Sequence, residues 1–418
     1  MNPWRELRAL PREIWFLCLA TLVNRAGTMV LPFLTLYLTV NRKFSPATAG
    51  LALTIYGIAA IIVAPLSGRL SDHFGALQII KLSLVISGLI LFIFPFVSGL
   101  QGILAITGLW AVANEAFRPP SMSTIGNLAG PAHRKAAFAL SRLAINLGMS
   151  IGPVIGGFLA MRSFKLLFYV DGTTSILASS LLILLPWRSP TSIARSKAEA
   201  DDSTGVGDAA VAPVLSYSSV FRNRRFIFFL LAMLPIEMVF FQSLAAMPLF
   251  IVRDLHMTEA GFGTLLAINT VMIILIEVPL NSAMADWPHR RALALGAFLV
   301  GAGFGALIFG GGILGVAATV VVWTFGEMIL LPASAAYVSD IAPPAQSGAY
   351  MGLYAMGFSV AFAIGPFLGV QALERSGAAS VWIGAFVCGC ITATALLFLP
   401  GEESDSTKAA ASESAADH

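Results

Sequence analysis

Apolar residues fill long, continuous runs of the chain, and short polar segments separate these runs. A helix needs about 20 apolar residues to cross a bilayer, and the runs reach this length. The pattern therefore predicts an all-α membrane protein with twelve transmembrane helices. We expect these helices over residues 14–40, 47–69, 77–98, 102–125, 136–160, 164–187, 225–252, 258–284, 291–312, 314–338, 347–373 and 377–400.

The two halves of the chain repeat one pattern of residues, about 213 positions apart. The matching pairs are Pro65 and Pro279, Asp72 and Asp286, Glu115 and Glu327, Pro120 and Pro332, and Gly152-Pro153 and Gly365-Pro366. Many carriers are built from two such repeats around a site near the membrane midplane. We therefore predict two pseudo-symmetric six-helix bundles, at residues 1–187 and 225–400, with helices 1, 4, 7 and 10 lining a central cavity.

Two segments lack the apolar pattern. Residues 188–224 are rich in Ser, Ala and Asp, which predicts a flexible cytoplasmic linker between the bundles. Residues 401–418 are small, polar and acidic, which predicts a disordered cytoplasmic tail. Most Lys and Arg residues outside the runs lie in segments on the same side as both termini, so the positive-inside rule predicts that both termini are cytoplasmic. The expected location is the inner or plasma membrane.

Composition supports a membrane protein and disfavours other classes. The chain is 57% hydrophobic and 11% charged, and its mean hydropathy is +0.83. Its net charge of +3 bears on topology and does not indicate a nucleic-acid partner. The sequence has no phosphate-binding loop followed by Lys-Ser/Thr, no nucleophile–base cluster and no metal-ligand spacing. We therefore expect a monomeric protein that is not an enzyme and has no cofactor or metal, and whose partners are the bilayer, protons and a small-molecule substrate.

Two local motifs indicate a family. Residues 68–75 read Gly-Arg-Leu-Ser-Asp-His-Phe-Gly, and residues 148–157 of the fifth helix read Gly-Met-Ser-Ile-Gly-Pro-Val-Ile-Gly-Gly. Both resemble signature motifs of the major facilitator superfamily, and the second is similar to the motif of its drug:proton antiporters. The resemblance covers all twelve helices and implies gating roles for these motifs. The family's basic pair is replaced by Ala76-Leu77, whereas His289-Arg290-Arg291 occupies the equivalent turn of the second half.

The candidate gating residues fall into two groups. Three glycines of the fifth helix recur at every fourth position, which leaves one helix face without side chains and permits close helix approach. The resemblance implies that the partner is the eighth helix. The two repeated aspartates lie at cytoplasmic helix ends near basic residues, where a carboxylate is favourable. The gating candidates are Gly68, Asp72, Gly75, Gly148, Gly152, Pro153, Gly156, Asp286 and Arg290.

Ionisable residues inside the predicted helices are candidates for function, because such groups are costly in a membrane. The first half holds the bases Arg25, Arg118 and Arg142 with one acid, Glu115, whereas the second half holds the acids Glu237, Glu277 and Glu327 without a base. A buried carboxyl group without a fixed cation favours its protonated form. The acids of the second half are therefore suited to carry a proton.

We expect Glu327 to be the principal proton carrier and Glu237 to be the second. Arg118 follows Glu115 by three residues, so the two can share a helix face and pair, whereas Leu330 occupies the equivalent position after Glu327. Glu115 is thus either a structural partner of Arg118 or a coupling element. The family resemblance adds that an arginine in the fourth helix of drug:proton antiporters is tied to proton coupling, and Arg118 occupies that region here.

Other polar and aromatic residues inside the helices could line a substrate cavity, although each also fits packing or a local hydrogen bond. Arg142 and Asn146 share a face of the fifth helix. The cavity candidates are Asn24, Arg25, Tyr56, Arg142, Asn146, Gln242, Asn269, Trp323 and Tyr354.

Three functional hypotheses follow. The first is a proton-coupled antiporter that exports small lipophilic or cationic molecules by alternating access, which the fifth-helix motif favours. The second is a proton-coupled carrier of amino acids or short peptides, in which Arg25 and Arg118 hold the carboxylate and Glu327 holds the ammonium group. This arrangement is similar to that of proton-dependent peptide transporters, although Asn24-Arg25 replaces their Glu-rich helix 1 signature. The third is a non-transporting membrane sensor, which the lack of an extra folded domain disfavours.

Overall fold

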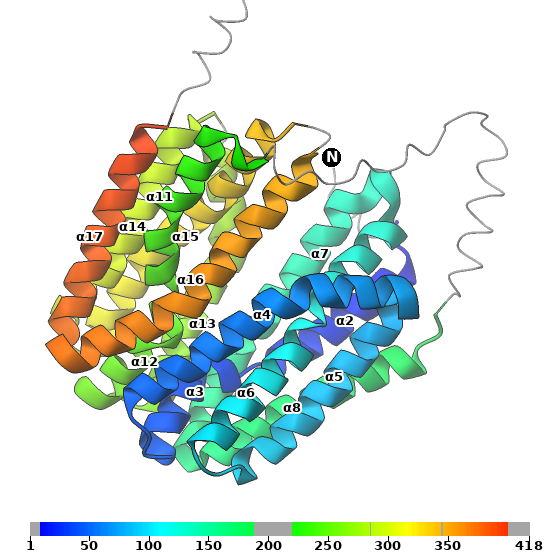
Figure 1. Ribbon diagram of the computed structural model, residues 1–418, viewed down its shortest axis with the longest axis horizontal. Coiled ribbons are helices and arrows are strands. Elements are labelled where there is room, and N and C mark those ends of the chain that lie inside the picture. The colour runs from blue at the N-terminus through cyan, green and yellow to red at the C-terminus, as the bar shows by residue number, and fades with distance from the viewer. Residues whose placement is uncertain (1–8, 188–219, 285, 344–345, 400–418) are drawn as a thin grey trace, which may run out of the picture. The chain divides into compact units, whose positions relative to one another are not determined.

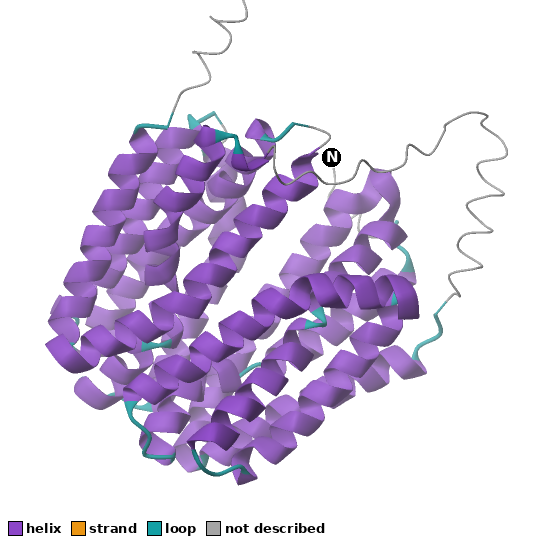
Figure 2. Cartoon of the chain, in the orientation of Figure 1, coloured by secondary structure: helices purple, strands orange, loops and turns teal. Residues whose placement is uncertain are grey.

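The computed structural model describes residues 9–187, 220–284, 286–343 and 346–399. Within these ranges the chain is almost entirely helical and contains no strand (Figure 2). Twelve helical segments of the described chain are long and apolar enough to cross a membrane, which confirms the predicted all-α fold of a multi-pass membrane protein. The predicted tail, and the predicted linker up to residue 219, lie outside the described residues.

Within each described range, short connections join consecutive helices (Figure 1). The α-helices are α2 (Arg12–Gly27), α3 (Val30–Leu36), α4 (Pro46–Phe74), α5 (Ala76–Ile93), α6 (Leu100–Glu115), α7 (Arg118–Arg162), α8 (Phe164–Leu184), α11 (Arg224–Phe240), α12 (Ala246–Leu249), α13 (Glu259–Ala283), α14 (His289–Gly305), α15 (Gly312–Ile341), α16 (Ser347–Ser376) and α17 (Ala378–Leu397).

Some spans combine more than one of these helices. The first span, Arg12–Asn41, consists of α2, α3 and a terminal π-helical turn, Tyr37–Asn41. α7 contributes to two spans, Leu100–Ala129 and Ala136–Arg162. The seventh span ends at Leu244, earlier than the predicted residue 252, because the backbone leaves the helical conformation at Ala245 (φ −120°, ψ −82°).

The chain divides into two compact units. Unit 1 comprises Met1–Val214 and Met247–Ile274, and unit 2 comprises Leu215–Ala246 and Leu275–His418. The first part of α13 therefore belongs to unit 1, although the sequence pattern placed the whole helix in the second bundle.

The same packing pattern occurs in both units. In unit 1, α2 packs against α7 and α8, and α5 packs against α6 and α8. In unit 2, α11 packs against α16 and α17, and α14 packs against α15 and α17. These are equivalent pairs under the repeat of the sequence, so the packing confirms the pseudo-symmetry of the two halves.

Glycines bring three helices of unit 2 into backbone contact. A Cβ atom added to Gly301 of α14 would lie 2.5 Å from the Cα atom of Gly389 in α17. A Cβ atom added to Gly326 of α15 would lie 2.5 Å from the backbone nitrogen of Val300 in α14. α14, α15 and α17 therefore form a core that has no intervening layer of side chains at these points.

The boundary residues of α4 explain where that helix begins and ends. The Ser45 hydroxyl accepts a hydrogen bond from the Thr48 N–H (3.2 Å), and Pro46 occupies the first helical position. Both features are favourable at a helix start. The helix ends at Gly75, whose φ of +89° is rarely adopted by residues with a side chain. Gly75 thus fixes the turn between α4 and α5.

Candidate functional site

The first span is interrupted in the middle, and a buried carboxylate stabilises the interruption. α2 ends at Gly27 and α3 begins at Val30. The N–H groups of Met29 and Val30 both donate to Oδ2 of Asp171 in α8, at 3.2 and 3.1 Å. Asp171 is 4% exposed. Because a buried N–H group without a partner is costly in a membrane, Asp171 supplies acceptors that the broken helix lacks.

Asp171 is a candidate that the sequence analysis missed. It is the only acidic residue in the sixth apolar run, so the rule that selected Glu115 and Glu237 would also have selected it. Its role as an acceptor for the first span was not visible in the sequence, because the interruption at Thr28 and Met29 contains no proline or glycine at the broken positions.

Glu115 belongs to a hydrogen-bonded cluster between α4 and α6. The Tyr56 hydroxyl donates to Oε1 of Glu115 (2.8 Å), and Nδ2 of Asn114 donates to the Tyr56 hydroxyl (2.6 Å). Tyr56 is 2% exposed, and its ring packs edge-on against Trp110. The cluster therefore orients the Glu115 carboxyl group in the interior of unit 1.

The suggested pairing of Glu115 with Arg118 is not formed within the described residues. α6 ends at Glu115 and α7 starts at Arg118, so the two residues do not share one regular helix. Pro119 and Pro120 follow directly, and residues before a proline are disfavoured in a helix. Arg118 is exposed, and Glu115 is bonded to Tyr56 instead.

Replacing Tyr56 with phenylalanine tests this cluster. The variant removes the donor to Glu115 and the acceptor for Asn114 but keeps the aromatic ring. We expect the purified protein to lose about 2 kcal/mol of stability, because two hydrogen bonds are lost and each contributes about 1 kcal/mol. The measurement is thermal unfolding in detergent. The matched control is Tyr37→Phe, because Tyr37 is also 2% exposed but its hydroxyl makes no hydrogen bond within the described chain. Equal melting temperatures for the two variants would contradict the assignment.

Arg25 and Asn24 lie on the last turn of α2. Nδ2 of Asn24 donates to the Ser175 hydroxyl of α8 (3.0 Å), and Asn24 is buried. Arg25 is half-buried, and its charge interacts with Asp171 and Tyr56. Its Nε atom is buried and has no hydrogen-bond partner among the described residues. Arg25 is therefore a cation of unit 1 that retains hydrogen-bonding capacity.

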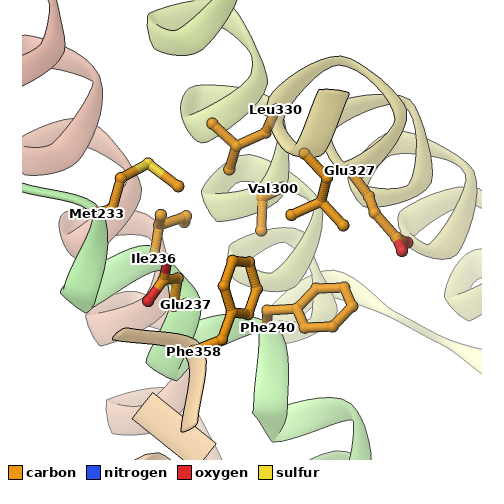
Figure 3. Close-up of a pocket in the computed structure, with 9 residues that line it drawn as sticks. Met233, Ile236, Glu237, Phe240, Val300, Glu327, Leu330 and Phe358 are labelled. Atoms are coloured by element: carbon orange, nitrogen blue, oxygen red, sulfur yellow. The ribbon is translucent and has the colours of Figure 1, made fainter. Parts of the chain in front are cut away.

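Unit 2 contains a small, mostly apolar pocket around Glu237 (Figure 3). Its lining residues are Met233, Ile236, Glu237, Phe240, Val300, Glu327, Leu330, Leu331 and Phe358. Glu237 is 3% exposed, and its Oε2 atom would lie 3.5 Å from a Cβ atom added to Gly357 of α16. Within the described chain its carboxyl group makes no hydrogen bond and no ion pair. A carboxyl group in such surroundings is stable only when something neutralises its charge.

Glu327 lines the same pocket but differs from Glu237. Glu327 is half-buried, and it takes part in an interaction of its own. Figure 3 shows its carboxyl group pointing away from that of Glu237. The sequence favoured Glu327 as the principal proton carrier, whereas the burial of the two side chains favours Glu237.

Three of the aromatic and amide candidates of unit 2 take part in helix packing. Nε2 of Gln242 donates to the carbonyl oxygen of Gly365 in α16 (2.8 Å). The Tyr354 hydroxyl is hydrogen-bonded to Ser334 of α15. Trp323 is 2% exposed and stacks on Phe304 of α14, with 5.2 Å between ring centroids. Their positions favour a structural role over the lining of a cavity.

The remaining candidates lie at varied depths. Asn269 and Glu277 of α13 are buried, each 9% exposed, and both have interaction partners. On α7, Arg142 is exposed and also has a partner, whereas Asn146 is half-buried. The expectation that these residues line a substrate cavity stays a prediction.

The glycine stripe of the fifth span, Gly148, Gly152 and Gly156, packs against the end of α2 and the residues that lead into α3. The prediction that these three glycines contact the eighth helix is therefore wrong. A Cβ atom added to Gly148 would lie 2.5 Å from Cβ of Arg25, and one added to Gly152 would lie 2.8 Å from the carbonyl oxygen of Thr28. Gly156 similarly faces Met29. Positions four apart on a helix share one face, and here that face covers the interruption of the first span.

The eighth span does contact α7, but on the adjacent face. A Cβ atom added to Gly157 would lie 2.5 Å from the carbonyl oxygen of Glu259, and one added to Gly263 would collide with the carbonyl oxygen of Pro153. Pro153 and Gly157 are again four residues apart, so they form a second close-approach face of α7, turned toward the beginning of α13.

The candidate gating residues at the helix ends lie at the surface. Asp72, Asp286 and Arg290 are exposed, and neither aspartate forms an ion pair within the described ranges. Gly68 has open space where a side chain would extend. In unit 2, Nε2 of His289 in α14 is hydrogen-bonded to Oδ2 of Asp340 at the end of α15 (2.8 Å).

Comparison with known proteins gives one family and several relatives. A model of the Major Facilitator Superfamily matches residues 17–252 and 238–417. The uncharacterized MFS-type transporter YqjV of Bacillus subtilis is 24% identical over 96% of this chain and 95% of its own length. A Na(+), Li(+), K(+)/H(+) antiporter of Planococcus maritimus is 23% identical over 82% of this chain and 85% of its own. The multidrug resistance protein MdtH of Aeromonas salmonicida is 23% identical over 92% of this chain and 94% of its own.

Solved structures of transporters share the fold. The nucleoside transporter NupG matches with a TM-score of 0.76 and 15% identity, over 92% of this chain and 99% of its own. A POT family transporter in complex with 5-aminolevulinic acid matches with a TM-score of 0.73 and 18% identity, over 93% of this chain and 96% of its own. At such identities the likeness concerns the arrangement of helices and not the substrate.

Proposed function

Because this chain belongs to the major facilitator superfamily of membrane transporters, we propose that it is a proton-coupled antiporter that exports small lipophilic or cationic molecules. The observation that carries the proposal is the environment of Glu237. This carboxyl group is 3% exposed, lies in a pocket of mostly apolar side chains, and has no ion pair or hydrogen bond within the described chain. Either a proton or a cationic substrate would neutralise it.

Competition for one carboxyl group produces antiport. If Glu237 can be neutralised by a proton or by a substrate cation, binding of one weakens binding of the other. When a proton gradient is directed into the cell, the site binds a proton from the outside. It releases this proton to the cytoplasm, where the site can then bind the substrate. Phe240, Phe358 and Met233 provide apolar and aromatic contacts suited to a lipophilic cation.

Two relatives support this choice of chemistry. One is described as an antiporter of monovalent metal ions and protons, and another is described as a multidrug resistance protein. Both descriptions fit a carboxylate that exchanges a proton for another cation. The pocket around Glu237 is lined mainly by apolar side chains, and hard metal ions prefer several oxygen ligands. We therefore favour an organic cation as the substrate.

The proposal extends to location and topology. We place the protein in the inner or plasma membrane as a monomer, with both termini cytoplasmic, because Lys and Arg are concentrated in the segments on that side. Spans 1, 4, 7 and 10 would surround the transport path, since they hold Arg25, Glu115, Glu237 and Glu327.

A second candidate is a proton-coupled carrier of amino acids or short peptides. The observation that favours it is Arg25, whose buried Nε atom has no hydrogen-bond partner among the described residues. A substrate carboxylate would supply one.

Transport into liposomes distinguishes the two candidates. Purified protein is reconstituted, the membrane potential is clamped with valinomycin and equal potassium, and a pH gradient is imposed. An antiporter accumulates tetraphenylphosphonium when the interior is acidic. This permanent cation avoids the passive trapping of weak bases, and empty liposomes measure leakage. A carrier of zwitterions instead accumulates amino acids or dipeptides when the exterior is acidic. Absence of pH-dependent cation uptake would exclude the antiport proposal for this probe class.

A further inference from the structure

Asp171 does more than supply acceptors to the broken first span, because it also interacts with Arg25, the cation of that span. Its carboxylate accepts the N–H groups of Met29 and Val30, and it also interacts electrostatically with Arg25. Arg25 lies one turn before the interruption, and its carbonyl oxygen accepts the Thr28 N–H (3.1 Å). One carboxylate thus contacts the break on one side and acts on the guanidinium on the other.

The face of α8 around Asp171 matches the first span over more than one turn. Thr174 and Ser175 lie three and four residues after Asp171, so the three share one helix face. Ser175 accepts the hydrogen bond from Asn24 (3.0 Å), and Gly27 lies so close to Thr174 that no Cβ atom would fit. This face fixes the end of α2, where Arg25 lies.

The other side of the break is fixed by α7. Gly148 lies against Cβ of Arg25, and Gly152 lies against the carbonyl oxygen of Thr28. The backbone on both sides of Arg25 is therefore confined, and the direction of its side chain depends on the contacts that hold the break.

The second repeat provides an internal comparison. The chain also leaves the helical conformation at Ala245, directly after the seventh span, but there an amide, Gln242, bonds to the carbonyl oxygen of Gly365. At the offset of 213 residues that relates Gly152 to Gly365, Met238 corresponds to Arg25 and Gly384 corresponds to Asp171. The acid and the base are present together in one half and absent together in the other, as expected if they act as a pair.

From this arrangement we infer that Asp171 is a positioning residue for Arg25. Its carboxylate keeps the first span broken at Met29, and its charge compensates the half-buried guanidinium. The Nε atom of Arg25, which lacks a hydrogen-bond partner among the described residues, then remains available to an acceptor group that faces it during transport. The inference rests on the proposed transport function and assigns Asp171 a role that acts through Arg25.

A double-mutant cycle tests the inference. Asp171→Asn keeps an oxygen that can accept the Met29 and Val30 N–H groups but removes the charge, and Arg25→Gln removes the cation. We expect Asp171→Asn to lower the maximal rate of tetraphenylphosphonium uptake about tenfold with a small change in KM, because residues in one network of interactions couple strongly. Adding Asp171→Asn to Arg25→Gln should cause no further loss. Losses that multiply in the double variant would overturn the inference.

Two further variants and a second readout complete the test. Asp171→Glu keeps both charge and acceptors and should recover at least part of the activity. Thr173→Val, on the exposed side of α8, should transport like the parent, because among the described residues the Thr173 hydroxyl bonds only to the Tyr169 carbonyl of its own helix. The same cycle is measured by melting temperature, which requires no transport. If the parent protein fails to move the probe, the proposed function fails, while non-additive melting temperatures still support the Asp171–Arg25 pair and additive ones contradict it.

Discussion

Replacing Glu237 with glutamine is expected to abolish accumulation driven by a pH gradient. Glutamine keeps the shape and hydrogen-bonding capacity of the side chain, but it cannot bind and release a proton. Exchange of labelled for unlabelled tetraphenylphosphonium at equal concentrations should remain partly intact, because exchange needs no net proton movement. Both processes are measured in the same proteoliposomes, with and without an imposed pH gradient. Gradient-driven accumulation at the parent level would remove Glu237 as the proton carrier.

Two variants serve as comparisons for Glu237→Gln. Glu374→Gln makes the same chemical change at an exposed position near the end of α16 and should leave accumulation unchanged. Glu327→Gln should give a milder defect, because Glu327 is only half-buried and has an interaction of its own. A complete loss of accumulation with Glu327→Gln and a mild loss with Glu237→Gln would show that Glu327 is the principal proton carrier, as the sequence suggested.

Replacing Gly152 with leucine is expected to impair transport severely while the protein still reaches the membrane. A Cβ atom at this position would lie 2.8 Å from the carbonyl oxygen of Thr28, so a leucine side chain must displace the interrupted part of the first span. Overpacking of this kind costs about 1–3 kcal/mol. The measurements are the amount of protein in the membrane, its melting temperature and its rate of exchange.

The control for Gly152→Leu is Gly384→Leu. Gly384 is also a glycine inside a membrane-spanning helix, but nothing lies within 4 Å of a Cβ atom added there. The leucine should be tolerated at this position. Equal behaviour of the two variants would show that close approach of α7 to the first span is not required.

The sequence was sufficient to predict the architecture because the membrane requires long apolar helices. Each of the twelve spans was located from hydropathy, and the repeat of Pro65 as Pro279 and of Glu115 as Glu327 indicated the two related halves. These features depend on residue type and spacing along one helix, which a sequence contains directly.

The contacts of the site could not be predicted in the same way. Spacing suggested that Glu115 pairs with Arg118, but the helix ends between them. The Glu115 carboxylate instead accepts a hydrogen bond from Tyr56 of another helix. Likewise, the four-residue spacing of the glycine stripe predicted a close contact but could not identify the partner. Partner choice depends on how helices pack across the bundle, and one helix can have two close-approach faces, as Pro153 and Gly157 show.

The glycine contacts of α14, α15 and α17 determine where the protein can deform. Helices in backbone contact, as at Gly301 and Gly389, have no side-chain layer that could rearrange to let them slide. The interruptions at Met29 and Ala245 are different, because hydrogen bonds of side chains hold the chain there, those of Asp171 at Met29 and that of Gln242 near Ala245. Each interruption follows a helix that holds a charged candidate, Arg25 in α2 and Glu237 in α11. A change in either charge would therefore act close to a point where side chains, and not a continuous helix, determine the path of the backbone.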